Sequence, residues 1–250
     1  LSSWVDGAAS TVSLVSVVQD AIEVRTPTGS VVASVDLSDL FAGLATQPNV
    51  VTSPQVEFDE TAGRFVLVAN GDAGLDVAQL LLAVSETDDA GGNWSVWGID
   101  TTPGSLNFAY NPKLALDATR AVIAYSTHEP AGGAFVDGSV VLYRKSDLYA
   151  GTTGTSRTYT STNFFGVLPV SDPAATSGSL YAFELWNDTN VALHTISGTP
   201  GSESMTEASS FILVPNYVTS SPGALLPQAR ASRWRLPPPA RRKPRLCWMA

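Results

Sequence analysis

The stretch "SPQVEFDETAGRFVLVAN" (residues 53–70) decides the fold, because its pattern returns later in the chain. Two alternating apolar runs flank a short polar segment, which is typical of a β-hairpin. Asp59 can accept backbone N–H bonds in the connecting turn, and Gly63 can supply the positive φ that such a turn uses. "NPKLALDATRAVIAYST" (residues 111–127) has the same order, with Asp117 in the place of Asp59. The sequence therefore predicts two copies of one hairpin.

The repeat extends beyond these hairpins. "QLLLAVSE" (79–86) follows the first copy and "SVVLYRKS" (139–146) follows the second at about the same offset. A weaker third copy contains "GVLPVSDP", "SLYAFELWN", "VALHTISG" and "SSFILVPN", in which Asp172 follows Asp117 at nearly the same interval. "AIEVRTPTGSVVASVDL" (21–37) predicts one more hairpin near the start. Four-stranded units that recur at a regular period are typical of β-propeller blades, because one sheet cannot cover both of its faces alone.

We therefore predict an all-β fold, a β-propeller of four-stranded antiparallel blades, with no long amphipathic helix. About four blades are expected, at 11–50, 51–108, 109–163 and 164–217, inside one propeller domain at 1–228. Four blades are the minimum of the usual range, so an incomplete propeller is expected. The outer faces of its terminal blades would then be bare, which favours self-association.

Charge divides the chain into two parts. Residues 1–229 hold seven of the fourteen cations and all 23 acidic residues, a net charge of −16 (7 − 23). Such an acidic body argues against nucleic-acid binding, whose affinity comes chiefly from Lys and Arg contacts to phosphate. Residues 229–250 form a basic, Pro- and Arg-rich tail, which predicts disorder or a shifted reading frame, with a polybasic arm for nucleic acid or anionic membrane as the alternative.

Other features of the sequence bear on location. No run of about 18 uncharged apolar residues appears, so no membrane-spanning helix is expected. Leu1 opens the chain without a start methionine or a signal segment, which predicts a mature form or a fragment. Cys247 is the single cysteine and lies in the basic tail, so it gives no disulfide framework.

The stretch "ETDDAGGNWSVW" (86–97) combines three carboxylates with two glycines and two tryptophans. Its Thr87-x-Asp89-x-Gly91-x-x-Trp94 pattern predicts a structural turn between two strands. The Asp side chain would tie backbone amides, Gly would take a conformation denied to other residues, and Trp would pack beneath the turn. A calcium loop built on Glu86, Asp88 and Asp89 is the alternative, although these residues do not follow EF-hand spacing.

This pattern matches the Asp-box, and with the repeats above it supports a family resemblance. The blades resemble those of bacterial secreted or cell-surface β-propeller domains, which are distantly similar to Asp-box (BNR, sialidase-like) repeat proteins. The resemblance covers residues 20–200. It implies a propeller fold and an extracellular or cell-envelope location, and it leaves the function open, because one fold carries many functions.

Four carboxylates stand where the first strand of a blade would face the central channel, and they are the candidate catalytic residues: Glu57, Asp59, Asp117 and Asp172. Glycoside hydrolysis would need two of them about 5–10 Å apart. Their recurrence from blade to blade favours turn closure over catalysis. We interpret the arginines of residues 1–229 as structural residues. They do not form the recognisable arginine cluster that a sialidase needs to bind the carboxylate of its substrate. His128 and His194 lack a third ligand at zinc spacing, so no metal centre and no cofactor are predicted.

Aromatic residues on loops are the candidate ligand-binding residues. Trp97, Tyr110 and Trp186, with Phe108 and Tyr217, could stack on sugar rings, and packing inside the blades is the alternative. The predicted function is a secreted or surface-displayed binding or scaffold module that recognises a protein or glycan through its channel-mouth loops. A propeller glycoside hydrolase or lyase is the second hypothesis, and an inactive truncated fragment is the third. The sequence favours a non-enzymatic role without excluding an enzyme.

Overall fold

The computed structural model describes residues 5–72, 78–101, 103, 105, 107–130, 133–172, 178–187, 190–207 and 212–213. By internal contacts the chain divides into two units, 1–216 and 217–250, and all described residues belong to the first. The expected basic tail at 229–250 and Tyr217 therefore lie outside the described residues. No helix within the described part is long and apolar enough to cross a membrane.

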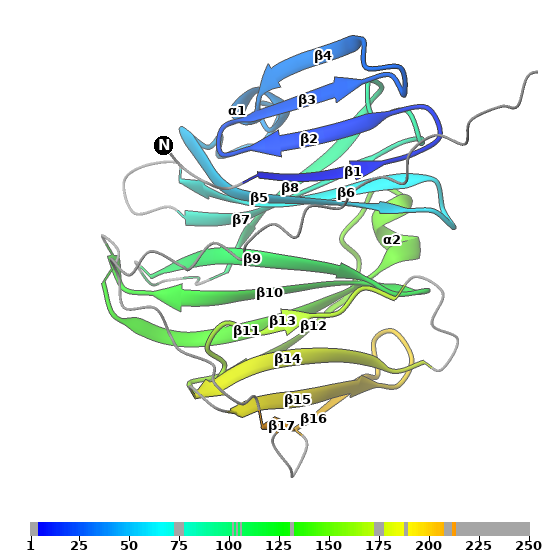
Figure 1. The fold of residues 1–250 in the computed structure, drawn as a ribbon. Helices are drawn as coiled ribbons and strands as arrows, with labels where there is room; N and C mark the ends of the chain where they lie inside the picture. The colour runs from blue at the N-terminus through cyan, green and yellow to red at the C-terminus, as the bar shows by residue number, and fades with distance from the viewer. Residues whose placement is uncertain are drawn as a thin grey trace, which may run out of the picture. The chain divides into compact units, whose positions relative to one another are not determined.

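The described residues form four antiparallel sheets, and in the first three the strands follow chain order (Figure 1). The first sheet has β1 (Val5–Ala9), β2 (Leu14–Val18), β3 (Ala21–Arg25) and β4 (Val31–Asp36). The second has β5 (Val50–Asp59), β6 (Arg64–Asp72), β7 (Ala78–Ser85) and β8 (Trp94–Asp100). The third has β9 (Phe108–Leu116), β10 (Arg120–His128), β11 (Phe135–Arg144) and β12 (Ser156–Ser161). Two short helices, α1 (Leu37–Leu40) and α2 (Lys145–Tyr149), follow β4 and β11.

The fourth sheet differs from the pattern that the sequence predicts. It contains β13 (Leu168–Pro169), β14 (Leu180–Asn187), β15 (Asn190–Ser197), β16 (Ser204–Glu207) and β17 (Ile212–Leu213). "SSFILVPN" was expected to supply the fourth strand, but β16 pairs with the end of β15 and the short β17 pairs with its beginning. The first sheet also includes β1, which precedes the expected blade range 11–50. The prediction of an all-β propeller of four-stranded antiparallel blades is confirmed.

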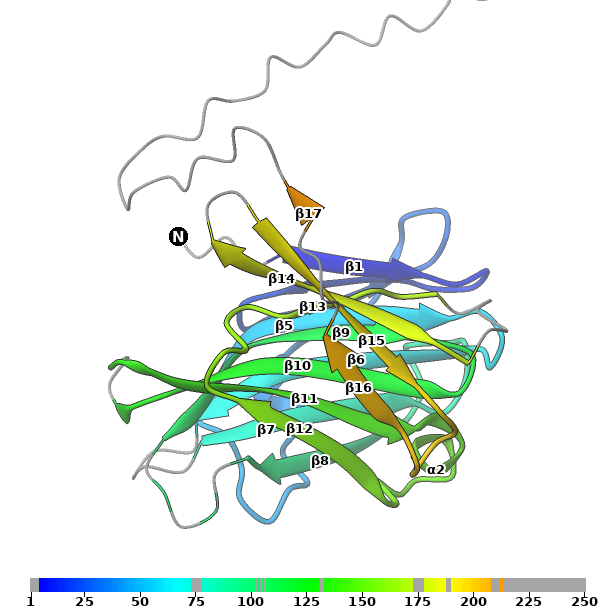
Figure 2. The same cartoon turned by 90° about the horizontal axis from the view of Figure 1, so that it is seen from below.

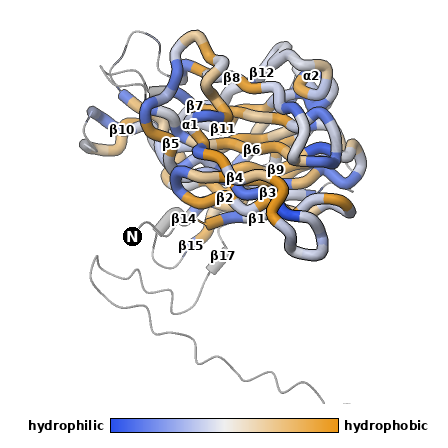
Figure 3. The backbone as a smooth tube through the Cα atoms, turned by 90° about the horizontal axis from the view of Figure 1, so that it is seen from above, coloured by the Kyte–Doolittle hydropathy of each residue, from blue (hydrophilic) through white to orange (hydrophobic). Residues whose placement is uncertain are grey.

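Burial on both faces explains why the sheets follow one another. Along β6 the side chains of Phe65, Leu67 and Ala69 join an apolar cluster shared with the first sheet, whereas Val66 and Val68 join a cluster shared with the third. Successive side chains of a strand point to opposite faces of its sheet, and here a neighbouring sheet covers each face. Full burial of one such side chain contributes about 1.5–3 kcal/mol. In Figure 3 the hydrophobic segments accordingly follow the strands and many hydrophilic segments lie in the connections.

The first strands of the sheets, β1, β5, β9 and β13, are neighbours along the inner edge of the fold (Figures 1 and 2). An inner strand has hydrogen-bonding groups without a partner in its own sheet, and neighbouring blades supply side chains to them. The Val56 amide donates to Asp6 Oδ2 at 3.0 Å, and the Leu114 amide donates to Gln55 Oε1 at 2.9 Å. The inner strands are therefore joined by side chains rather than by a shared ladder.

Two inner strands carry the same irregularity. Ser53 and Asn111 have φ values of 52° and 53°, each directly before a proline, and they occupy matching positions in the two copies of the repeat. The pairing of β5 with β6 and of β9 with β10 shifts register at these points. A residue before proline normally takes an extended conformation, so these are β-bulges that the fold imposes at equivalent positions.

Candidate functional site

Asp59 closes the turn between β5 and β6. Its Oδ1 atom accepts the amides of Thr61 (3.1 Å) and Ala62 (3.2 Å), and Gly63 completes the turn at φ 64°. In the first sheet Ser10 Oγ accepts amide bonds in the corresponding turn between β1 and β2. The side chain at the end of the inner strand thus serves the turn.

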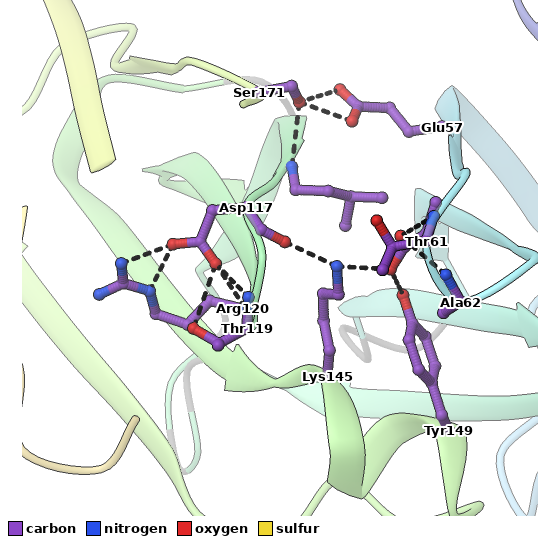
Figure 4. A network of polar contacts seen from close by, with 11 residues as sticks. Glu57, Thr61, Ala62, Asp117, Thr119, Arg120, Lys145, Tyr149 and Ser171 are labelled. Carbon is purple, nitrogen blue, oxygen red and sulfur yellow. Dashed lines mark hydrogen bonds and ion pairs between the residues drawn. The ribbon is translucent and has the colours of Figure 1, made fainter. Parts of the chain in front are cut away.

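The second oxygen of Asp59 joins two blades (Figure 4). Asp59 Oδ2 forms an ion pair with Lys145 Nζ and accepts a 2.6 Å hydrogen bond from the Tyr149 hydroxyl, both on α2 of the third sheet. The Asp59 residue is 0% exposed, and Lys145 Nζ also donates to the Asp117 carbonyl at 2.6 Å. Burial alone would raise the pKa of Asp59, but the bonds from Lys145 and Tyr149 together outweigh it and hold the pKa below its usual 3.8.

Asp117 has an equivalent but differently paired environment. Its Oδ1 accepts the amides of Thr119 (2.7 Å) and Arg120 (2.6 Å), and its Oδ2 pairs with the Arg120 guanidinium at 2.5 Å. Both residues are buried, and Arg120 also donates to the carbonyls of Gly178 and Gly198 in the fourth sheet. The carboxylates of Asp59 and Asp117 are thus occupied by turn amides and by ion pairs.

The stretch with the Asp-box pattern also lies at a contact between blades. Asp89 Oδ1 accepts the Gly91 amide (2.9 Å) and the Ser13 hydroxyl (3.2 Å) of the first sheet, and Trp94 Nε1 donates to the Ala90 carbonyl at 3.0 Å. The expectation for Gly91 is corrected, because its φ is outside the left-handed region. A Cβ at Gly91 would instead lie 3.0 Å from a Val32 methyl, so close approach accounts for the glycine.

Glu57 and Asp172 have different environments. Glu57 is half-buried, and the Ser171 hydroxyl contacts its two carboxylate oxygens at 2.7 and 2.6 Å (Figure 4). Burial raises the pKa of Glu57, the Ser171 bond partly offsets this, and the Asp6 carboxylate raises it further. Lys113 lies on the neighbouring inner strand, and burial lowers its pKa while Asp6 opposes that shift. Asp172 is exposed and pairs with Asp117 through a backbone bridge.

Five aromatic rings gather at the opposite ends of the strands, where β9 and β11 begin and β10 ends. The chain of ring contacts runs from Phe108 to Tyr110 (6.3 Å), to His128 (5.5 Å), to Phe135 (5.9 Å) and to Phe165 (5.1 Å) between centroids. Most of these contacts are edge-to-face, which leaves ring faces pointing in several directions. Tyr110 is 42% exposed and Phe165 is 58% exposed. We call this group the aromatic cluster.

The predicted stacking residues separate in the structure. Tyr110 and Phe108 are in the aromatic cluster, whereas Trp97 lies on β8 and packs against the apolar cluster between the second and third sheets. Trp186 lies on β14, and its side chain is outside the described residues. Sequence reasoning missed Phe165, Phe135 and the stacking role of His128, because these residues come from three separate connections or strand ends. The available signal in the sequence was that each of these three positions carries an aromatic side chain.

Two depressions of about 320 and 360 Å³ lie at the other strand ends, on either side of Tyr149. The larger one is lined by Asp59 and Lys145, which are buried and already paired with each other. We therefore favour the aromatic cluster, whose exposed rings offer a contact surface, as the candidate site. In the described part of the chain no group of three or more His, Cys, Asp or Glu side chains is arranged to hold a metal ion.

Comparisons with known proteins support the fold and leave the function open. No family model matches the chain, and no curated protein matches it. The sialidase Hz136, described as a Hadza microbial sialidase, is similar in structure with a TM-score of 0.51 and 17% identity, over 83% of this chain and 46% of that one. A subtype N11 neuraminidase-like protein of A/flat-faced bat/Peru matches with a TM-score of 0.47 and 8% identity, over 82% and 56%.

The exo-β-1,3-galactanase of Phanerochaete chrysosporium matches with a TM-score of 0.44 and 13% identity, over 82% of this chain and 49% of that one. The chain thus spans about half the length of these solved structures. Its described residues form four consecutive blades of a β-propeller, and their fold is similar to that of the sialidase Hz136.

Proposed function

We propose that this chain is a carbohydrate-binding β-propeller domain that holds an uncharged sugar against the aromatic cluster. The observation that carries the proposal is the exposure of Tyr110 and Phe165 within one continuous chain of ring contacts. Sugar rings present C–H faces that pack on aromatic rings, and exposed aromatic residues held in a fixed array are a surface suited to that contact.

Polar groups beside the rings supply the hydrogen bonds that a sugar needs. Ser126 Oγ lies between the Tyr110 carbonyl and His128 Nε2, at 3.4 and 3.3 Å. Asn111 follows Tyr110 in the bulge of β9, and its Oδ1 accepts a 2.9 Å bond from Lys113. Hydroxyl, imidazole and amide groups of this kind can donate to or accept from sugar hydroxyls and give orientation.

The positions of the basic side chains favour an uncharged ligand. All seven cations of residues 1–229 are described, and six of them are engaged away from the aromatic cluster: Arg25 with Glu23, Arg64 with the Ser85 carbonyl, Arg120 with Asp117, Arg144 with the Pro200 carbonyl, Lys145 with Asp59 and Arg157 over the Tyr159 ring. The seventh, Lys113, is the cation nearest the aromatic cluster, and it is already engaged: it donates to Asn111 Oδ1 and interacts electrostatically with the Asp6 carboxylate. A carboxylated sugar would need an Arg or Lys side chain at the site that can form charge-assisted hydrogen bonds with its carboxylate.

Titration calorimetry against neutral galacto-, xylo- and gluco-oligosaccharides and against sialyllactose tests this function. A neutral oligosaccharide is expected to bind, and Tyr110→Ala or Phe165→Ala should weaken it by about tenfold each, the size of a good interface contact. Tyr181→Ala is the matched control, because Tyr181 is 46% exposed but lies on the fourth sheet. Preferential binding of sialyllactose, or no binding of any neutral sugar, would overturn the proposal.

The second candidate function is glycoside hydrolysis, and the environment of Glu57 favours it. A raised pKa suits a general acid, and the Asp6 carboxylate is near enough to raise that pKa further. Turnover of aryl glycosides that falls by more than about a hundredfold in Glu57→Gln would support an enzyme, since acid catalysis contributes at least that much. Glu207→Gln, at an exposed carboxylate on β16, is the control. Equal residual activity in the two variants would argue against a catalytic Glu57.

The remaining assignments belong to the same proposal. An extracellular or cell-envelope location suits a sugar-binding domain, and the turn at 86–97 serves as an Asp-box.

The outer face of the fourth sheet is a surface for self-association, because Leu168, Val170, Tyr181 and Phe183 are exposed there and Leu168 pairs with Phe183. Light scattering after size exclusion should detect dimers that Phe183→Lys abolishes. If the chain binds no ligand and stays monomeric, the inactive-fragment hypothesis gains support.

A further inference from the structure

A buried ionisable pair in the fourth sheet has no part in the contacts described so far. Glu184 on β14 and His194 on β15 have side chains that are each 1% exposed, and Glu184 Oε2 lies 2.9 Å from His194 Nε2. The ring of Phe164 meets the His194 ring edge-to-face, with 5.3 Å between centroids. Burying two such groups is costly unless their hydrogen bonds are fully used.

The other oxygen of Glu184 leads from this pair to the aromatic cluster. Glu184 Oε1 accepts a 2.6 Å hydrogen bond from the backbone amide of Phe165. That amide also approaches the Asn163 carbonyl at 3.0 Å within its own turn. Phe165 lies in the connection between β12 and β13 and is the most exposed ring of the cluster. The hydrogen bond that the Phe165 amide donates to this buried carboxyl therefore fixes the backbone that presents the ring.

The same connection is also held from the third sheet. A Cβ added to Gly138 on β11 would lie 1.8 Å from the Phe164 carbonyl oxygen, so the backbone at Phe164 rests directly on Gly138. The Phe164 amide donates to the Ser161 carbonyl at 3.1 Å. The turn at 163–165 thus has β11 on one side and Glu184 on the other, and Phe165 has little freedom to leave the ring of Phe135.

We infer that Glu184 and His194 are positioning residues, which hold Phe165 in the orientation that the sugar-binding site uses. This inference rests on the proposed function. The two oxygens of the Glu184 carboxyl have separate partners: Oε1 accepts the Phe165 amide and Oε2 contacts His194 Nε2. A ring that is fixed before the ligand arrives does not lose rotational and backbone freedom on binding, so the pair raises affinity without touching the sugar.

A double-mutant cycle on the full chain tests the inference. Phe165→Ala and Glu184→Met should each weaken binding of the neutral oligosaccharide by about tenfold, and the double variant should be no weaker than either, because both changes remove the same fixed ring. Methionine keeps the volume of the side chain and removes its hydrogen-bond acceptor. Glu184→Gln should retain affinity within about threefold, since the amide oxygen can accept the Phe165 bond and the amide nitrogen can donate to neutral His194.

Two readouts separate positioning from general stability. Additive losses in the cycle, or a Glu184→Gln variant as weak as Glu184→Met, would overturn the inference. Amide hydrogen exchange at Phe165 provides a measurement that needs no ligand and no variant. Phe165 should exchange slowly in the native chain, and Glu184→Met should accelerate that exchange by more than about tenfold while amides of β10 stay protected. Fast exchange at Phe165 in the unaltered chain would overturn the inference even if Glu184→Met did not fold.

The exchange measurement also separates this inference from the proposed function. If the unaltered chain binds no sugar while Phe165 is protected through Glu184, the proposed function fails and the positioning contact stands. If sugar binding depends on Phe165 but is unaffected by Glu184→Met, the function stands and the positioning role fails.

Discussion

The Tyr149 hydroxyl donates a 2.6 Å hydrogen bond to Asp59 Oδ2 across the boundary between the third and second blades. Lys145, one helical turn before Tyr149, pairs with the same oxygen. The connection between the third and fourth strands of one blade thereby binds the first turn of the preceding blade. Asp89 with Ser13, and Arg144 with the Pro200 carbonyl, also join adjacent blades. The blades are thus linked by polar contacts at their turns as well as by apolar faces.

Asp59→Asn is expected to destabilise the chain by about 3–5 kcal/mol, because it leaves the buried charge of Lys145 without a carboxylate and with only the neutral Asp117 carbonyl as its partner. Asp59→Asn combined with Lys145→Met should recover most of that loss, since the buried charge that lost its carboxylate is then removed as well. Urea unfolding followed by circular dichroism measures both. Asp172→Asn, at an exposed carboxylate, should stay within about 0.5 kcal/mol. A loss below about 1 kcal/mol in Asp59→Asn would contradict this account.

Acid should weaken the chain through the same residue. The pKa of Asp59 is below its usual 3.8 in the folded chain, so the folded state binds fewer protons at this carboxyl than the unfolded state. Its contribution is fully present above about pH 5, and it is lost as the pH falls through 3.8 toward the lower folded pKa. Stability measured from pH 6 to pH 2 should fall less steeply in the Asp59→Asn, Lys145→Met double variant than in the unaltered chain. Parallel curves would show that Asp59 is not the group responsible.

Glu57 should act in the opposite direction. Burial raises its pKa above the usual 4.5, so the folded state holds this proton more tightly than the unfolded state. The ionised carboxylate then costs free energy at neutral pH, and stability falls as the pH rises from 4.5 through the raised value. Glu57→Gln should accordingly be as stable as the unaltered chain or more stable at pH 7, and should lose any advantage near pH 4. Thermal unfolding at both pH values checks this, and a Gln variant that is less stable at pH 7 would disagree.

Gly63→Ala should cost about 1 kcal/mol, because Gly63 has φ 64° and a left-handed residue with a Cβ is strained by about that amount. A Cβ there would be 3.7 Å from Asp88 Cβ, an ordinary contact, so the cost comes from the backbone conformation. Gly43→Ala is the matched control, since no atom lies within 4 Å of its added Cβ and its φ is outside the left-handed region. Equal urea midpoints for the two variants would contradict the assignment.

The repeat could be predicted from the sequence because its signals are local. Alternation along 53–70 and 111–127 gave the hairpins, and Gly63 takes the left-handed conformation that the turn was expected to need. The last sheet was only partly predicted: the described residues of "SSFILVPN" form β17, which pairs with the beginning of β15, whereas β16, "SMTE", pairs with the end of β15. Which segment pairs with the end of β15 is determined by the length of the turn after β15, rather than by the hydrophobicity of the segment.

The candidate site was only partly predictable. Tyr110 could be singled out as a ring on a loop, but Trp97, chosen for the same reason, packs between sheets. The carboxylates chosen by repeat position, Asp59 and Asp117, are buried in ion pairs. Arg120 lies three residues after Asp117, but Lys145, the partner of Asp59, comes from the next blade, and nothing in the local sequence indicates it. Composition and spacing report which groups exist, whereas burial and pairing depend on which blade lies beside them.

The sequence by itself determined the blades of this protein, because strand alternation, turn residues and their regular recurrence along the chain are properties of short segments. Only the tertiary structure decided what the side chains do. The rings of Phe108, Tyr110, His128, Phe135 and Phe165 meet through strand ends and connections from several parts of the chain. Likewise Glu184 reaches the Phe165 amide only because β14 packs beside the connection that precedes its sheet. Contacts between segments distant in the chain arise from packing, and no local pattern encodes them.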